Sequence, residues 1–459
     1  IMLPASVASV IVYFSTVCAG KVPVMINWTI GGRNLRSALE NTHVSHVITA
    51  HALVSKLKSQ GASFRGIEQK FVFLEDIGKS LGKVEKVFAL VKSYVSWRSL
   101  RSCKIHEHSV ILFTSGSESF PKAVPLTHKN QLANVKDVFK YVTIYENDRF
   151  VAFLPPFHSF GITVTILMSM LGGIQTVYHA NPTDAARIGK IVDAYQATLI
   201  PGTPTFLSGI LRASTVDQLA SLRISVTGAE KCSESIYALF QQKCPQMRVL
   251  EGYGITECSP IVSVCPYEMK LKNSIGKVLP SIQYRLIDPE TKALLPKSAK
   301  EGVLIVSGPS IFGGYLNYEG ESPFLHFENI LWYNTGDIIQ FDENDCLTFK
   351  GRKKRFIKLG GEMISLPAIE TVLFDYFSSS GDDGPILAVD STSDEHKPEI
   401  VLFTTIDLDR EKVNEQIKLG GLSPLHNIRQ IIKLETIPIL GTGKTDYKKL
   451  KLKLIVDQT

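Results

Sequence analysis

The first half of the chain alternates short β-rich runs with helical patterns, and this alternation restricts the fold more than any other feature. Between about residues 22 and 251 the β-rich runs are 44–50, 71–74, 109–113, 150–154, 197–200 and 222–226. Strands that alternate with helices form parallel sheets covered by helices, because each parallel connection has to cross back over the sheet. We therefore predict an α/β fold for this part.

The pattern changes twice further along the chain. Residues 274–350 form short strands separated by Gly, Pro and Asp turns, which predicts a small antiparallel or barrel-like subdomain. Beyond it we expect a helix at 367–377, strands at 386–389 and 400–405, a helix at 410–419 and a basic C-terminal helix. Because 459 residues exceed what one hydrophobic core serves, we predict a large domain at 1–353 and a small, mobile α+β domain at 354–459.

Composition narrows the class of protein. With 44% hydrophobic and 20% charged residues the chain has an ordinary globular composition. The formal net charge of +6 is modest for this length and does not indicate nucleic-acid binding. Seven scattered cysteines without a CxxC pair argue against a zinc site or a disulfide framework. A reducing, cytoplasmic location fits best.

The first 20 residues are apolar. They lack a basic start and carry Pro4, so we expect a buried helix leading into a strand rather than a signal or membrane segment. A peripheral membrane contact is left open. The chain opens without an initiator Met, which leads us to expect that an upstream part is missing.

A Ser-rich loop at 113–122, Phe-Thr-Ser-Gly-Ser-Glu-Ser-Phe-Pro-Lys, is the strongest local signal for chemistry. It follows the strand at 109–113 and precedes a helix expected to start near Thr127. Small residues let backbone N–H groups converge on an anion, hydroxyls donate to its oxygens, and Lys122 adds a positive charge. The spacing is not that of a Walker loop, and an ordinary loop is the alternative.

Three more segments carry polar groups suited to a nucleotide. In Glu-Gly-Tyr-Gly-Ile-Thr-Glu at 251–257, Thr256 and Glu257 offer the oxygen ligands that Mg²⁺ prefers. Asp337 and Arg352 provide an acceptor and a donor for ribose hydroxyls. Lys444 lies in the glycine-flanked run Gly-Thr-Gly-Lys at 441–444. Taken singly, each of these segments is also compatible with an ordinary turn.

Together and in this order, the segments resemble the acyl-adenylate-forming superfamily of acyl-CoA synthetases, peptide-synthetase adenylation domains and firefly-type luciferases. The resemblance covers nearly the whole chain. Within the superfamily, FTSGSE, LPPFHSFG at 154–161, TGAEK at 227–231 and EGYGITECSP at 251–260 look most like the acyl-acyl-carrier-protein synthetase branch. That branch includes the ligase half of 2-acylglycerophosphoethanolamine acyltransferase.

The resemblance implies ATP and Mg²⁺ as cofactors and a fatty acid as substrate. The β- and γ-phosphates would be bound by Thr114, Ser115, Gly116, Ser117 and Lys122. Glu257 would bind Mg²⁺, and Thr256 would contact the α-phosphate. The adenosine would be bound by Gly228, Ala229, Glu230, Tyr253, Gly254, Asp337 and Arg352.

The same resemblance assigns the moving parts. Lys444 matches the catalytic lysine that bridges the acyl carboxylate and the α-phosphate, and His158 matches a position beside that carboxylate. Lys354 falls on the hinge, where rotation would withdraw Lys444. Gly360 and Gly361 would then leave space for a pantetheine arm.

The expected acceptor is the thiol of acyl carrier protein, which makes the enzyme an acyl-carrier-protein ligase of lipid metabolism. Acidic carrier proteins would dock on the basic run at 352–358, with Arg355 as the residue to test. Two alternatives remain open: a fatty acyl-CoA synthetase, and a non-catalytic adenylate- or carrier-binding homologue.

Overall fold

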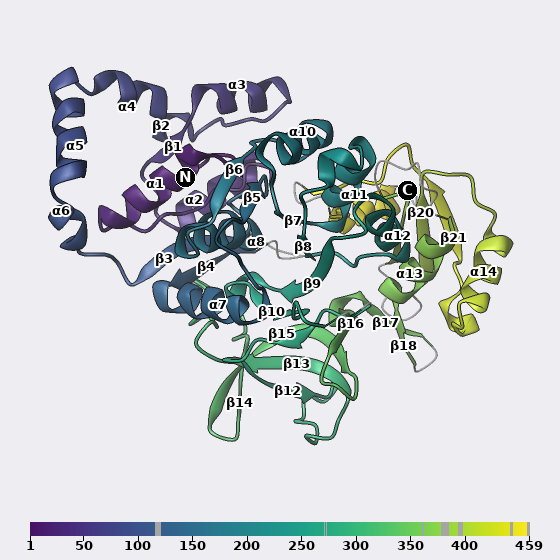
Figure 1. The fold of residues 1–459 in the computed structure, drawn as a ribbon. Helices are drawn as coiled ribbons and strands as arrows, with labels where there is room; N and C mark the ends of the chain where they lie inside the picture. The colour runs from purple at the N-terminus through teal and green to yellow at the C-terminus, as the bar shows by residue number, and fades with distance from the viewer. Residues whose placement is uncertain are drawn as a thin grey trace.

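The computed structural model describes residues 1–114, 121–269, 271, 273–359, 362–377, 385–392, 398–440 and 444–456. Figure 1 shows a large body that carries the N-terminus and a C-terminal part beside it. The α/β class predicted from the alternation of strands and helices is confirmed.

A seven-stranded sheet forms the centre of the large body, in the order β11-β10-β9-β8-β7-β5-β6. Strands β6, β5, β7, β8 and β9 are mutually parallel, and β10 and β11 continue the sheet in antiparallel pairing. Its strands are β5 (Arg149–Ala152), β6 (Gln175–Tyr178), β7 (Leu199–Gly202), β8 (Ile224–Gly228), β9 (Arg248–Gly254), β10 (Ile261–Val264) and β11 (Lys277–Val278).

Helices cover this sheet on both faces (Figure 1). Helices α10, α11 and α12 pack against one another in sequence, and α7 contacts β4 and β10. Thr127 caps α7 through its side chain, as expected for a helix starting there. The helices are α7 (His128–Tyr141), α8 (Ser159–Ile162), a π-helical turn (Thr163–Met168), α9 (Ser169–Leu171), α10 (Ala185–Tyr195), α11 (Pro204–Ala213) and α12 (Glu234–Lys243).

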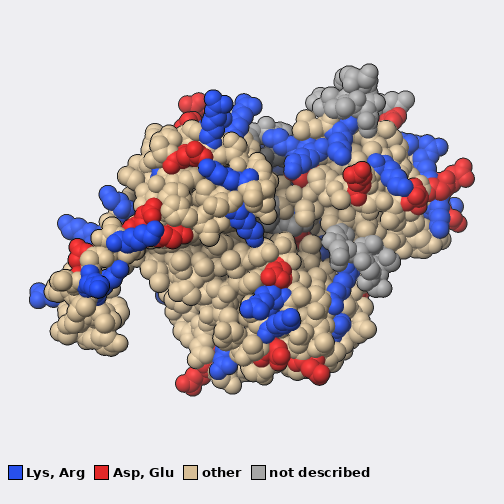
Figure 2. All heavy atoms as spheres, turned by 90° about the horizontal axis from the view of Figure 1, so that it is seen from above, with Lys and Arg blue, Asp and Glu red and all other residues tan. Residues whose placement is uncertain are grey.

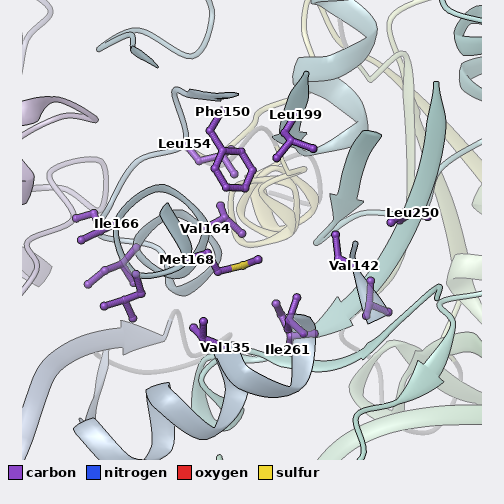
Figure 3. Close-up of a cluster of buried hydrophobic side chains, with 14 of the residues drawn as sticks. Val135, Val142, Phe150, Leu154, Val164, Ile166, Met168, Leu199, Leu250 and Ile261 are labelled. Atoms are coloured by element: carbon purple, nitrogen blue, oxygen red, sulfur yellow. The ribbon is translucent and has the colours of Figure 1, made fainter. Parts of the chain in front are cut away.

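The main hydrophobic core lies between the sheet and these helices. Figure 3 shows Val135 of α7, Met168 of the π-helical turn, Leu199 of β7 and Ile261 of β10 converging on one cluster. The β-rich runs at 150–154, 197–200 and 222–226 therefore supply buried strands, as their apolar sequences predict.

A buried ion pair ties together the starts of three strands at the amino edge of this sheet. Asp148, just before β5, is 2% exposed and pairs with Arg223, just before β8. Thr198, just before β7, donates to the same carboxylate at 2.6 Å. Burial acts to raise the pKa of Asp148, but hydrogen bonds from Arg223 and Thr198 outweigh it and lower that pKa.

The N-terminal residues differ from the expectation in two ways. Helix α1 (Val7–Cys18) forms, but the following residues make only an isolated bridge between Val24 and Ile111 instead of a strand. The run at 109–113 becomes β3 (His108–Thr114), which pairs antiparallel with β4 (Lys122–Thr127) and lies outside the parallel sheet. Pro125 conceals β4 in the sequence, since proline is rare within strands.

Residues 32–101 add smaller elements. β1 (Val47–Thr49) and β2 (Phe71–Phe73) pair in parallel. The helices are α2 (Gly32–Asn41), α3 (His51–Ser59), a 3₁₀ turn (Glu68–Lys70), α4 (Leu74–Ser80), α5 (Lys83–Val95) and α6 (Arg98–Arg101). Helices α4 to α6 extend outward at the left of Figure 1.

The antiparallel subdomain predicted for residues 274–350 is present. Its strands are in the order β12-β13-β15-β14. Strand β14 pairs with residues 330–333 of β15, and β16 pairs with residues 337–341 of β15. The strands are β12 (Gln283–Ile287), β13 (Glu301–Ser307), β14 (Phe324–Phe327), β15 (Ile330–Phe341) and β16 (Leu347–Arg352).

The C-terminal part, residues 354–456, has hydrophobic clusters of its own. Strands β19, β20 and β21 form one sheet, and β17 pairs with β18. Its elements are a 3₁₀ turn (Lys353–Arg355), β17 (Phe356–Leu359), β18 (Glu362–Ser365), α13 (Leu366–Phe377), β19 (Leu387–Ser391), β20 (Ile400–Thr404), α14 (Arg410–Leu419), a 3₁₀ turn (Pro424–His426), β21 (Gln430–Lys433) and α15 (Tyr447–Val456). The domain boundary at 353/354 stays a prediction.

Candidate functional site

The predicted site residues gather at the carboxyl edge of the parallel sheet. β5 leads to the turn with His158, β8 ends at Gly228, and β9 ends at Gly254, shortly before Thr256. Carboxyl ends of parallel strands all open onto one edge, which is where α/β proteins bind ligands. Residues that are far apart in the sequence are therefore collected at one place.

An aromatic pair joins Lys122 to Glu257. The ammonium of Lys122 lies 4.1 Å from the ring centroid of Tyr318 and 4.8 Å from that of Tyr315. The Tyr315 hydroxyl donates to Oε1 of Glu257 at 2.6 Å, and Glu257 is 7% exposed. Burial and the charge of Glu257 raise the pKa of Tyr315, which keeps its hydroxyl a donor.

The phosphate-loop prediction is only partly visible. Thr114 ends β3 and lies opposite Lys122, which begins β4. The loop thus connects two antiparallel strands, and β4 separates it from the helix that starts after Thr127. Its phosphate-binding role stays a prediction. Ser115, Gly116 and Ser117 lie outside the described residues.

Thr256 and Glu257 offer oxygen ligands that suit Mg²⁺. The Thr256 hydroxyl lies 3.2 Å from the hydroxyl of Ser159. Among the described residues, no three His, Cys, Asp or Glu side chains form a metal cluster. A single carboxylate fits Mg²⁺ nevertheless, because this ion is commonly held by one or two carboxylates together with substrate phosphates and water.

Asp337 and Arg352 face each other across β15 and β16. Nε of Arg352 lies 3.2 Å from Oδ1 of Asp337, and the Tyr253 hydroxyl donates to Oδ2 at 2.5 Å. Asp337 is 1% exposed, while the Arg352 side chain is 60% exposed. Burial raises the pKa of Asp337 against the opposing effect of Arg352. This arrangement presents a fixed acceptor beside an accessible donor.

Residues 228–230 line the next strand end. A Cβ atom at Gly228 would lie 2.8 Å from the carbonyl oxygen of Gly252, so only glycine fits this close approach. Ala229 has φ +71°, in the left-handed region. Oε2 of Glu230 accepts from the Thr205 hydroxyl at 2.7 Å, whereas its buried Oε1 has no hydrogen-bond partner among the residues that the structure describes. Burial raises the pKa of Glu230.

The C-terminal part brings Lys444 to this same edge. Burial and the neighbouring Arg352 lower the pKa of Lys444, while Glu230 and Asp337 act in the opposite direction. Burial and the charge of Lys444 lower the pKa of His158 to about 3, so its imidazole is neutral at neutral pH. Within the described ranges, its buried Nε2 has no hydrogen-bond partner. A cation and a neutral imidazole therefore lie together at the strand ends.

Arg355 does not offer the exposed charge on which the predicted docking role depends. Its guanidinium contacts Glu370 at 3.1 and 3.2 Å, donates to the Val389 carbonyl and stacks on Tyr447 at 3.7 Å. The side chain is 21% exposed. Because every face of the guanidinium is engaged inside the C-terminal part, the expectation that Arg355 offers an exposed charge to a carrier protein is wrong.

The predicted hinge and thiol-tunnel residues are Lys354, Gly360 and Gly361. Lys354 lies in the 3₁₀ turn Lys353–Arg355 that leads from β16 to β17, and its hinge role stays a prediction. Gly360 and Gly361, predicted to border a thiol tunnel, lie outside the described residues.

Sequence reasoning missed several residues that support the site. Tyr315, Tyr318, Ser159 and Thr205 contact four of the predicted residues through their hydroxyls. The Gly-Gly pair at 313–314 signals a turn before Tyr315, but nothing in the sequence indicates that its hydroxyl reaches Glu257.

Solved structures share the fold of this chain. ATP-bound MatB from Rhodopseudomonas palustris matches with a TM-score of 0.79 at 21% identity, covering 98% of this chain and 87% of that chain. O-succinylbenzoate CoA synthetase from Bacillus subtilis, in complex with its acyl-adenylate intermediate, matches with a TM-score of 0.78 at 19% identity, over 98% and 87% of the two chains. The fold is that of adenylate-forming enzymes.

Sequence comparison defines the family. The model of the family described as AMP-binding enzyme matches residues 1–316. Over 98% of its length the chain is 25% identical to a long-chain-fatty-acid–CoA ligase of Escherichia coli, of which it covers 86%. It is 24% identical to 4-coumarate–CoA ligase-like 6 of Arabidopsis thaliana, over 98% of this chain and 80% of the relative. The chain belongs to the AMP-binding enzyme family, and its class is that of ATP-dependent acyl-adenylate-forming ligases.

Proposed function

We propose that this ligase activates a fatty acid as acyl-AMP and transfers the acyl group to a thiol, which we assign to the phosphopantetheine of acyl carrier protein. The observation that carries the proposal is the meeting of Lys444 with His158, Glu230 and the Asp337–Arg352 pair at the strand ends. A lysine that can be withdrawn from a nucleotide site would have a use in acid activation and none in simple adenylate binding. This weighs against the non-catalytic alternative.

In the first half-reaction, a carboxylate oxygen of the acid attacks the α-phosphorus of ATP, and pyrophosphate leaves. Both reactants are anions, so positioning and charge neutralisation are the main tasks of the protein. Lys444 would contact the oxygens that carry the developing charge, and neutral His158 would donate to the acid through its unpartnered Nε2. Lys122 would neutralise the leaving phosphates.

The nucleotide would be held by complementary donors and acceptors. Asp337 would accept from ribose hydroxyls, with Arg352 beside it, and Tyr253 would keep the carboxylate oriented. The free Oε1 of Glu230 suits the exocyclic amine of adenine, since a buried acceptor needs a donor. Glu257 would hold Mg²⁺, which when bound neutralises phosphate charge, and Thr256 would contact the α-phosphate.

In the second half-reaction the thiol sulfur attacks the acyl carbonyl, the thioester bond forms and AMP leaves. Lys444 would first be withdrawn by rotation about Lys354. The assignment of carrier protein rests on the sequence motifs alone, because the docking argument from Arg355 does not hold. CoA is therefore a second candidate, and the CoA ligases among the relatives favour it.

Two assays test the proposal in order. ATP–pyrophosphate exchange, measured with fatty acids of increasing chain length and with aromatic acids, reports the first half-reaction and the acid. Thioester formation is then measured with holo-carrier protein and with CoA over the same concentration range. If none of the carboxylic acids supported exchange, the enzyme assignment would be contradicted. Exchange followed by a clear preference for CoA would move the acceptor to the second candidate.

A further inference from the structure

Helices α4, α5 and α6 form an arm that stands away from the rest of the molecule (Figure 1). All residues of α5 are exposed, and the helix buries none of its side chains. Val84 is 82% exposed, Phe88 68%, Tyr94 84% and Val95 77%. A helix with this many exposed apolar side chains is unusual in a globular protein and indicates a surface that binds something.

Five apolar residues of α5 lie on one side of the helix, while Leu90, which is 58% exposed, lies off that side. Val84, Val87, Phe88, Val91 and Val95 follow the i, i+3, i+4, i+7, i+11 spacing of a single stripe. Tyr94 lies at the margin of this stripe. Trp97, directly after the helix, is 56% exposed and extends the aromatic character of the surface. The arm therefore has one continuous apolar face with an aromatic end.

The charged residues of the arm are mostly basic. Residues 74–104, which include the arm, contain seven basic side chains and three acidic ones, Glu75, Asp76 and Glu85. Their net charge is +4, out of a formal net charge of +6 for the entire chain. Figure 2 shows the arm as a projection at the left, mostly uncharged, with more basic than acidic residues on it. Much of the excess positive charge of the protein thus lies where its apolar residues are most exposed.

We propose that the arm binds the surface of an anionic lipid bilayer, with α5 lying in the plane of the interface. Apolar side chains enter the acyl boundary, aromatic residues lie at headgroup level and basic residues pair with anionic headgroups in this binding mode. Helix α5 has 13 residues, about 20 Å at 1.5 Å per residue, which is too short to cross a bilayer core of about 30 Å. Among the described helices, none has the length and apolar character to span a membrane.

The charge of the arm favours a bilayer over a second copy of the chain as its binding partner. Two arms that met face to face would bring a charge of +4 against another of +4, which opposes association. An anionic bilayer instead complements the basic residues. The inference does not rest on the proposed function, since vesicle binding is measured without substrate, but it would place a fatty acid ligase at the phase into which its substrate partitions.

Vesicle co-sedimentation of the full chain tests the arm. We expect the protein to pellet with vesicles of phosphatidylcholine containing 30% phosphatidylglycerol, and at least roughly tenfold less with pure phosphatidylcholine. Raising the salt concentration from 0.05 to 0.5 M should weaken binding strongly, because headgroup attraction is screened. Phe88→Ser should lower the affinity for anionic vesicles by roughly tenfold, as should Lys83→Glu combined with Lys92→Glu.

Control variants that match these changes can be made on the surface away from the arm. Leu419, at the end of α14, is 72% exposed, so Leu419→Ser removes an equally exposed apolar side chain and should leave binding unchanged. Lys412→Glu with Lys418→Glu on the same helix makes the same charge change away from the arm. Fluorescence adds an independent readout: Trp97 should shift to shorter wavelength on binding, and Trp97→Phe should abolish most of that shift.

Two results would overturn the inference. Equal vesicle binding by the unmodified protein and by Phe88→Ser would show that the arm is not the contact. Loss of a dimer in Phe88→Ser, measured by light scattering without vesicle binding by either protein, would assign the face to contacts between copies of the chain.

Discussion

The sheet edge and the C-terminal part contribute to one site in different ways. His158, Gly228, Glu230 and Thr256 follow neighbouring strands of one sheet, so the order of the strands fixes their positions. Lys444 belongs to a part with separate hydrophobic clusters. Among the residues that the structure describes, hydrogen bonds between the large body and the C-terminal part include Lys231 to Thr371 at 3.4 Å and Ser365 to the Lys350 carbonyl at 3.4 Å.

This difference suggests separate roles for the sheet edge and the C-terminal part. A binding surface benefits from a rigid scaffold, whereas a group used in only one of two half-reactions has to be removable. Residues on the sheet edge should therefore matter for nucleotide and acid in both steps, and residues of the C-terminal part should affect one step at a time.

Lys444→Ala should have the largest effect. Loss of a buried ammonium that stabilises developing charge removes about 2 to 4 kcal/mol, or roughly 30- to 1000-fold in acyl-adenylate formation. Thioester formation from pre-made acyl-AMP should remain largely intact, as single-turnover assays can measure. Lys448→Ala, on the exposed side of α15, is the control. An equal decrease in both half-reactions would break the comparison between the two regions.

Arg355→Ala should destabilise the C-terminal part. It leaves the carboxylate of Glu370 without its guanidinium, and breaking such a largely buried pair lowers the free energy of unfolding by about 3 kcal/mol. Urea unfolding of the full chain measures this, with Lys418→Ala as the control. An unchanged midpoint, together with a salt-dependent increase in KM for carrier protein, would restore Arg355 as a docking residue.

His158 should make the sheet edge sensitive to acid. Its pKa is about 3 in the folded protein, from 6.5 in the unfolded chain, so the unfolded state binds the proton first as the pH falls. Stability is complete above pH 6.5 and decreases below it, by about 2 kcal/mol between pH 7 and 5. His158→Gln should remove this decrease, measured by urea unfolding at both pH values, whereas His426→Gln should not. Parallel curves for His158→Gln and the unmodified protein would contradict the assignment.

Lys354→Pro tests whether the C-terminal part rotates. Proline fixes φ near −65°, which is compatible with a 3₁₀ turn but restricts rotation. Adenylation should persist, while overall turnover should fall by about tenfold. Lys354→Ala, which keeps the backbone free, should retain both steps. Normal turnover in the proline variant would exclude a hinge at this residue.

Sequence patterns predicted the strands that carry the site. They were less successful for the side-chain contacts within the site. Apolar β-runs and turn residues mark β5, β7 and β8, because burial on both faces leaves a local signal. Pro125 concealed β4, and Arg355 seemed available because a run of basic residues does not show that Glu370 and Tyr447 surround one member. The exposure of α5 was also unpredictable, since an amphipathic pattern does not say whether a neighbour covers it.

The Asp148–Arg223 pair stabilises the amino edge of the sheet, opposite the edge where the candidate site lies. One carboxylate holds the starts of β5, β7 and β8 together at the edge opposite the site, because both of its oxygens accept hydrogen bonds from Arg223 and one of them also accepts from Thr198. The edge at the proposed site can then use close backbone approaches and unpartnered polar atoms without loosening the sheet. Changes at the strand ends near the proposed ligand can therefore alter the site, while the opposite edge keeps the register of the three strands.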